Sequence, residues 1–94
     1  MVKAVWKYKV IAETDNYEIV EGNYYFPPES VNKEFLMESD MHTSCPWKGL
    51  ASYYNLVIEG EVNKNAAWYY PNPKPEANKI KNYIAFWKGV EIKD

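Results

Sequence analysis

An alternation of apolar and polar residues at the start of the chain is the feature that most restricts its fold. From Val2 to Ala12 apolar residues occupy every even position, while Lys3, Lys7 and Lys9 stand at odd ones. Successive side chains of a β-strand point to opposite faces, so a period of two marks a strand with one face in a core. The sequence therefore predicts a half-buried strand over these residues.

Two pairs of β-forming runs farther along are each separated by a Glu-Gly dipeptide. The first pair is Tyr17–Val20 with Asn23–Phe26, and the second is Ala51–Ile58 with Glu61–Tyr70. Aromatic and β-branched residues favour strands, and glycine adopts the left-handed backbone of tight hairpin turns. The first pair predicts two short strands, and the second predicts a β-hairpin.

Prolines end the first group of strands. Pro27-Pro28 cannot donate to a sheet, and Ser30 can then cap a short helix from Val31 to about Met37. From Glu38 to Gly49 no period is visible, and this segment contains the single histidine and the single cysteine of the chain. We therefore expect a helix followed by an irregular segment.

Three alternate prolines interrupt the second half of the chain. Between residues 71 and 75 they predict an exposed, extended connector, with at most one helical turn over 76–79. The chain then closes as a strand over Lys81–Trp87 and Val90–Ile92, bent or bulged at Lys88-Gly89.

These elements predict one mainly β domain over residues 1–94, with about six or seven short strands and one short helix. A chain of 94 residues with 47% hydrophobic and 17% aromatic content can build one core. Large aromatic side chains must supply much of the buried surface in so small a domain.

Cysteine usage and charge restrict the compartment and the partners. Cys45 is the only cysteine, and the sequence shows neither a secretory leader pattern nor an apolar run near the length of a membrane span. We therefore expect a cytoplasmic protein with no membrane partner. The net charge of −2, with no arginine among eleven basic residues, also predicts no nucleic-acid partner.

The composition gives little support for a metal site or a cofactor site. One cysteine and one histidine cannot complete a four-ligand structural zinc site. The carboxylates of Glu21, Glu38 and Asp40 leave a hard-metal site as an alternative. We expect no metal and no cofactor.

The segment Thr43-Ser44-Cys45-Pro46-Trp47-Lys48-Gly49 contains residues that could carry chemistry. As a thiolate, Cys45 would be a nucleophile beside the Lys48 ammonium, whereas most free cysteines are inert packing residues. Lys48 could lay its stem on Trp47, or bind an anion at a pocket wall. His42 is either a surface histidine or a general base.

Adjacent aromatic residues on predicted strands form a second candidate feature. They are Tyr24-Tyr25, Tyr53-Tyr54 and Trp68-Tyr69-Tyr70. Because neighbours on a strand point to opposite faces, one of each pair packs in the core and the other is exposed or lines a groove. Rings placed in this way suit stacking on a flat ligand or partner.

Four stretches carry a family resemblance: Glu21-Gly22 with Tyr25-Phe26-Pro27, residues 43–54, residues 66–73, and Ile84-Ala85-Phe86-Trp87. In these stretches, and over nearly the whole chain, the sequence resembles the DUF427 family. The resemblance implies a compact β-tent architecture, similar to that of Mss4-like proteins, with one short helix. Zinc-binding proteins of that architecture use paired Cys-x-x-Cys knuckles, which this sequence lacks, so the resemblance implies no zinc.

The family also has the label NTP_transf_9, which suggests a nucleotidyltransferase-like domain. Such a site would need a Gly-Ser motif followed by an Asp-x-Asp pair to hold a nucleotide and Mg²⁺, and neither occurs in the sequence. The resemblance therefore implies a fold and a shared loop rather than a mechanism.

These observations predict a small-molecule binding site with a possible enzymatic role. Cys45 and Lys48 are the candidate catalytic residues, and Lys48 would meet an anionic group of the ligand. The candidate ligand-binding residues are Glu21, Tyr25, Thr43, Trp47, Tyr54 and Trp68. The alternative is a non-catalytic interaction module that self-associates, for example as a homodimer, with the loop as a packing plug.

Overall fold

Nine short strands build three antiparallel sheets in the structure, a computed structural model that describes residues 1–94. The strands are β1 (Val2–Trp6), β2 (Lys9–Thr14), β3 (Glu18–Val20), β4 (Asn23–Tyr25), β5 (Leu36–Cys45), β6 (Gly49–Ile58), β7 (Glu61–Tyr69), β8 (Ile84–Phe86) and β9 (Glu91–Lys93). The sheets have the strand orders β2-β1-β9, β3-β4 and β5-β6-β7-β8. The prediction of a mainly β chain is confirmed, although the number of strands is larger than expected.

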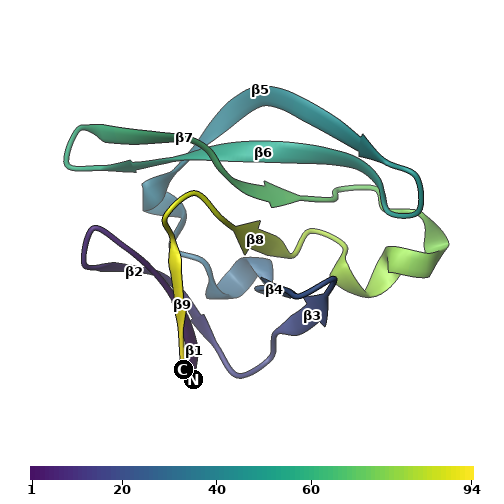
Figure 1. The fold of residues 1–94 in the computed structure, drawn as a ribbon, viewed down its shortest axis with the longest axis horizontal. Helices are drawn as coiled ribbons and strands as arrows, with labels where there is room; N and C mark the ends of the chain where they lie inside the picture. Colours follow the sequence, from purple (N-terminus) through teal and green to yellow (C-terminus); the bar gives the residue numbers. More distant parts are fainter.

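The four-stranded sheet lies over the two smaller sheets, so that the molecule has two layers (Figure 1). The larger core cluster lies between these layers, with Ile11 from β2, Leu56 from β6 and Phe86 from β8 among its members. A second cluster packs Val20 and Tyr25 against other buried residues that include Ile80. Cys45, Tyr53 and Trp68 pack against this second cluster.

The segment predicted as one strand from Val2 to Ala12 is instead the hairpin of β1 and β2. Lys7 and Tyr8 form its turn, with φ of 52° and 63°. Two consecutive residues with positive φ make the turn that best matches the twist of paired strands. Neither residue is a glycine or an asparagine, which hides the turn in the sequence. The hairpin leaves the Tyr8 side chain fully exposed.

The predicted helix from Val31 to Met37 is wrong. Two 3-10 turns, η1 (Pro28–Ser30) and η2 (Lys33–Phe35), stand in its place, and Leu36 already begins β5. Val31 forms a β-bridge with Ala12, and the Asn32 amide donates to the Ile11 carbonyl at 2.7 Å. These bonds to β2 hold Val31 and Asn32 in an extended conformation, so no helix can start there.

The segment without a visible period is mostly strand, because β5 extends to Cys45. β5 is an edge strand, irregularly paired with β6 between Glu38 and His42, and most of its side chains are exposed. A strand that buries neither face needs no alternation of apolar residues. For this reason the sequence pattern does not reveal β5.

The two Glu-Gly turns are confirmed. Glu21-Gly22 joins β3 to β4 and Glu59-Gly60 joins β6 to β7, with positive φ at all four residues. The proline-rich connector leads into one 3-10 segment, η3 (Pro75–Ile80).

The structure contains no helix with the length and apolar character needed to cross a membrane.

The strand predicted to bend at Lys88-Gly89 is in fact two strands in different sheets. β8 pairs with β7, and β9 pairs with β1. The turn between them is closed by a hydrogen bond from the Val90 amide to the Trp87 carbonyl at 3.3 Å. Through this turn the chain passes from one layer to the other.

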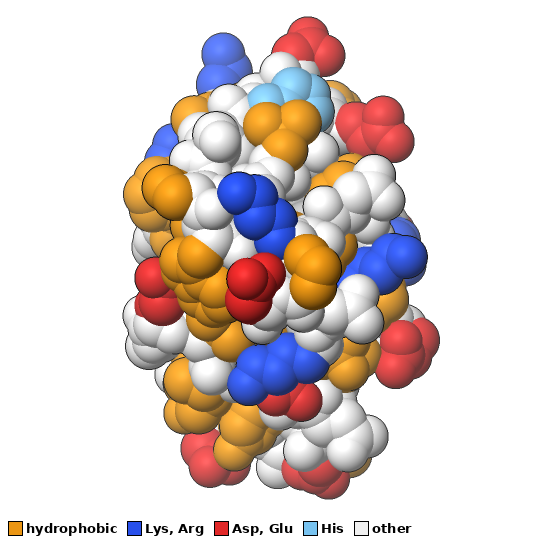
Figure 2. Space-filling model, turned by 90° about the vertical axis from the view of Figure 1, so that its right-hand side faces the viewer, with side chains coloured by type: hydrophobic (Ala, Val, Ile, Leu, Met, Phe, Trp, Pro, Cys, Tyr) orange, Lys and Arg blue, Asp and Glu red, His pale blue; other side chains and the backbone are white.

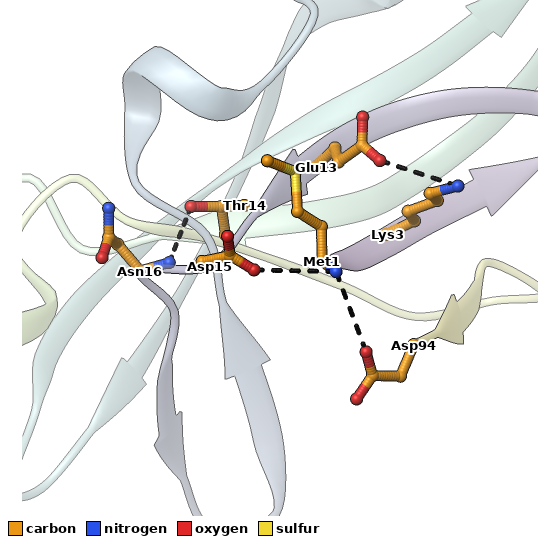
Figure 3. Close-up of polar contacts among 7 residues, drawn as sticks. All are labelled: Met1, Lys3, Glu13, Thr14, Asp15, Asn16 and Asp94. Atoms are coloured by element: carbon orange, nitrogen blue, oxygen red, sulfur yellow. Dashed lines mark hydrogen bonds and ion pairs between the residues drawn. The ribbon is translucent and has the colours of Figure 1, made fainter.

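The chain ends meet beside the first hairpin (Figure 3). The amino group of Met1 lies 3.6 Å from an Asp15 oxygen and 4.0 Å from an Asp94 oxygen. Lys3 and Glu13 form a further ion pair at 3.6 Å between β1 and β2. All these side chains are substantially exposed, so each pair contributes little to stability.

Candidate functional site

The site forms at the turn between β5 and β6. Cys45 pairs with Gly49 as the last step of the hairpin, and only Pro46, Trp47 and Lys48 lie outside the strands. The predicted loop from Thr43 to Gly49 is therefore the tip of a hairpin. This tip lies close to the connector before η3, on the right in Figure 1.

The proline-rich connector holds the backbone of this turn. The Lys74 amide donates to the Lys48 carbonyl at 2.9 Å, and Lys74 Nζ donates to the Pro46 carbonyl at 2.6 Å. Gly49 has a φ of 110°, and a Cβ there would lie 3.5 Å from the carbonyl oxygen of Asn72. A residue other than glycine would be strained at this φ. The connector thus positions the residue that precedes Gly49, which is Lys48.

Lys48 is a buried cation paired with a carboxylate. It is only 5% exposed, and its Nζ donates to Glu21 on the β3-β4 turn. The indole N–H of Trp47 donates to the other Glu21 oxygen at 3.3 Å. The ammonium also lies 5.5 Å from the centre of the Trp47 ring and 5.4 Å from that of Tyr70. The Glu21 carboxylate and the two rings together offset the free-energy cost of removing the Lys48 ammonium from water.

The pKa values of this pair follow from their contacts. Burial by itself would lower the pKa of Lys48, but the hydrogen bond to Glu21 and the nearby phenols of Tyr25 and Tyr70 raise it above its ordinary value. The hydrogen bonds from Lys48 and then Trp47 lower the pKa of the Glu21 carboxyl. Both groups are therefore charged at neutral pH.

Aromatic rings and Lys48 line an open hollow of about 210 Å³. Its lining residues are Lys48, Tyr53, Trp68, Tyr70 and Trp87. Trp68 and Trp87 meet edge to face, with ring centres 5.9 Å apart. Figure 2 faces the end of the molecule that carries the β5-β6 turn, where lysines and acidic side chains are interspersed with hydrophobic ones.

Hydrogen bonds fix the walls of this hollow. The Trp68 indole donates to the hydroxyl of Tyr25, which is fully buried, at 3.1 Å. The Trp87 indole donates to the Asn65 carbonyl at 2.6 Å. Thr43 and Tyr53 share a hydrogen bond of 3.0 Å between their hydroxyls. These bonds hold the rings of Tyr53, Trp68 and Trp87 in defined positions.

The structure brings together most of the residues predicted for the site. Glu21, Trp47 and Lys48 contact one another, Tyr25 supports Trp68, and Thr43 supports the wall residue Tyr53. Tyr54 is not part of this group. It stacks on Tyr69 at 4.8 Å and packs against the larger core cluster, on the opposite face of β6 from Tyr53.

Cys45, the candidate nucleophile, shares no hydrogen bond with Lys48, its proposed electrostatic partner, or with His42, the alternative general base. Cys45 is half-buried against the second core cluster, and its thiol makes no hydrogen bond. His42 contacts the Ser52 hydroxyl at 3.3 Å on the exposed part of β5. No group of three or more His, Cys, Asp or Glu side chains lies close enough together to hold a metal ion.

Three wall residues were not among the predicted site residues: Tyr53, Tyr70 and Trp87. Strand alternation indicates that only one of Tyr53 and Tyr54 can face the hollow, and the register with β7 decides for Tyr53 by placing it directly opposite Trp68. Trp87 follows β8, whose pairing with β7 brings it beside Trp68. That pairing joins segments distant in the chain and has no local signal in the sequence.

In a comparison with known protein families, residues 1–93 match the family model NTP_transf_9, described as a domain of unknown function (DUF427). The chain belongs to the DUF427 family. A search among curated proteins finds no match. The description of the family therefore assigns no activity to this DUF427 domain.

Alkaline solution is expected to destabilise this DUF427 domain. Burial, followed by hydrogen bonding with Tyr69, raises the pKa of Tyr54 from 10.0 to about 12. Between these values the unfolded chain loses the proton first, so the free energy of unfolding falls as the pH rises. The pKa values of Lys48 and Tyr70 are raised as well and act in the same direction.

Urea unfolding across this pH range tests the contribution of Tyr54. In Tyr54→Phe the decline in the free energy of unfolding should be less steep than in the wild type, because one ionisation is removed. Tyr8→Phe is the matched control, since Tyr8 is fully exposed. Equal slopes for the wild type and Tyr54→Phe would contradict the prediction.

Proposed function

We propose that the hollow beside Lys48 is a binding site for a small ligand with a flat ring and an anionic group. A lysine that is only 5% exposed and lines a hollow of aromatic rings carries the proposal. Burial of an ammonium costs free energy, and binding sites are places where such a cost serves a purpose. The rings would contact the flat part of the ligand, and Lys48 its anionic group.

The size of the hollow restricts the ligand. Sites for drug-sized molecules measure roughly 300–1,000 Å³, whereas an apolar cavity of about 150 Å³ holds benzene. With about 210 Å³, the hollow suits a single substituted ring. Benzoate, which combines one ring with one carboxylate, is therefore a suitable probe.

Binding is supported better than catalysis. The Lys48 ammonium is already paired with Glu21, and the Cys45 thiol has neither a base nor an acceptor within hydrogen-bonding distance. Nucleophilic catalysis by Cys45 with Lys48 as electrostatic partner stays a separate hypothesis. Full function of a Cys45→Ser variant would end it.

Self-association is the second candidate function. β5 is an edge strand with unpaired backbone groups, and Met37 and Met41 on it are exposed. Edges of this kind can pair with a second copy of the chain. A mass corresponding to one chain at high concentration in sedimentation equilibrium would remove this candidate.

For the architecture we propose the β-tent arrangement that the family resemblance implies. Nine short antiparallel strands in three sheets around a shared core support this assignment. A superposition on an experimentally determined β-tent domain would test it.

Removal of Trp87 is expected to weaken benzoate binding by about fivefold. Trp87 is 45% exposed, so the fold should tolerate Trp87→Ala, while the hollow loses one wall. An aromatic contact of about 1 kcal/mol corresponds to this factor. Isothermal titration calorimetry with wild type and variant gives the comparison. Tyr8→Ala, an exposed aromatic outside the hollow, is the control, and equal weakening in both variants would contradict the site.

A further inference from the structure

Glu21 binds Lys48 and Trp47 in the way that the carboxylate of a ligand would. One oxygen accepts from the Lys48 ammonium and the other from the Trp47 indole at 3.3 Å. Lys48 and Trp47 thus supply one hydrogen-bond donor for each oxygen of a carboxylate, as a carboxylate-binding site does. The acceptor comes from a different part of the chain, 27 residues earlier in the sequence.

Glu21 is also placed so that it can leave. It stands on the two-residue turn between β3 and β4, and its side chain is 52% exposed, whereas that of Lys48 is 7% exposed. Lys48 and Trp47 are the only hydrogen-bond partners of its carboxylate. When released, the carboxylate can turn into water at little cost, but Lys48 cannot.

The charge balance of the site decides whether an anionic ligand binds in addition to Glu21 or in its place. Lys48 and Glu21 together are neutral, and Lys48 is the only cation that lines the hollow. An anionic ligand added beside Glu21 would place two negative groups on one ammonium, and like charges at such a distance repel. A ligand that replaces Glu21 leaves the buried site neutral.

We propose that Glu21 is an intramolecular competitor for Lys48, and that the ligand of the hollow is an aromatic monoanion of the carboxylate class that displaces it. The inference rests on the proposed function of the hollow and adds the ligand class and its regulation. In the free protein Glu21 satisfies the ammonium and sets a threshold for binding. A neutral ligand of the same shape contacts the rings and leaves Glu21 in place.

The test compares two probes on two forms of the protein. Benzoate carries the carboxylate, and benzyl alcohol is a neutral molecule of similar shape. Glu21→Gln keeps an oxygen acceptor for Lys48 but removes the competing charge. We expect the affinity for benzoate to rise by at least about tenfold, the effect of losing one hydrogen bond between charged groups. The affinity for benzyl alcohol should stay within about twofold, since its ring contacts are unchanged.

Glu61→Gln is the matched control. Glu61 also forms an ion pair with a lysine, Lys7, at 2.8 Å. It begins β7 at the hairpin turn opposite the site (Figure 1). The control makes the same change in net charge, and its benzoate affinity should equal that of the wild type. An equal rise in both variants would overturn the inference in favour of a general charge effect.

The remaining outcomes separate the inference from the proposed function. If both probes bind and benzoate gains nothing in Glu21→Gln, Glu21 is no competitor, although the hollow still binds rings. If neither probe binds any form, the proposed function fails. Should Glu21→Gln not fold, as judged by thermal unfolding, Glu21→Asp shortens the reach by one methylene group. It should then give a smaller gain for benzoate, and the absence of that gain would overturn the inference.

Discussion

Phe26→Ala should lower the free energy of unfolding by about 3–5 kcal/mol, the range for truncating a large buried aromatic side chain. Phe26 is completely buried in the core between the layers and meets Phe86 edge to face at 5.6 Å. Its amide and carbonyl both bond to Ile84, each at 2.8 Å. Phe26 therefore joins the smaller sheets to the larger one. Small domains have only about 5–15 kcal/mol of stability, so this loss is a large fraction.

Urea unfolding measures this effect. Ile19→Ala serves as control because Ile19 is a large apolar residue on the neighbouring β3 that is 50% exposed. Its loss should stay within about 0.5 kcal/mol. A loss below about 1 kcal/mol for Phe26→Ala would mean that the contact between the layers contributes little to stability.

Trp68→Ala should combine a large loss of stability with the loss of ligand binding. Trp68 contributes a wall to the hollow, packs against the second core cluster and donates to the buried Tyr25 hydroxyl at 3.1 Å. Truncation removes all three contributions, at a cost of about 3–5 kcal/mol. Benzoate should no longer bind measurably, because Trp87 loses its edge-to-face partner as well.

A milder substitution separates the hydrogen bond from the packing. Trp68→Phe keeps a ring but leaves the Tyr25 hydroxyl buried without its donor, at a cost of about 1–3 kcal/mol. Adding Tyr25→Phe removes that hydroxyl and should recover part of the loss. A double-mutant cycle by urea unfolding gives the coupling energy. Strictly additive losses would show that this hydrogen bond does not stabilise the wall.

The parts of the fold that the sequence predicts are those with a local chemical signal. Glu-Gly dipeptides mark the turns after β3 and β6, and the prolines between residues 71 and 75 follow the end of β7. The first hairpin is hidden because Lys7 and Tyr8 adopt positive φ without a residue type that favours it. The pairing of Val31 with β2 overrides the capping signal of Ser30, a tertiary effect that no local pattern records.

The sequence predicts the candidate site only in part, again because some of its residues have a local signal and others depend on tertiary contacts. The sequence indicates Lys48 because a lysine stands between Trp47 and a glycine, and the structure shows its ammonium buried and paired. Alternation along β6 sends Tyr53 to the hollow and Tyr54 to the core, but the sequence alone does not say which goes where. Trp87 reaches the hollow only through the pairing of β7 with β8, which depends on the complete fold.

The most direct test of the ring-lined hollow as a ligand site is a titration of the wild-type protein with benzoate, followed through the indole N–H signals in two-dimensional NMR. Trp68 and Trp87 line the hollow, whereas Trp6 packs against the core between the layers. The signals of Trp68 and Trp87 should shift together and saturate, and that of Trp6 should stay in place. No shift up to the solubility limit of benzoate, or shifts that spare Trp68 and Trp87, would contradict the hollow as the binding site.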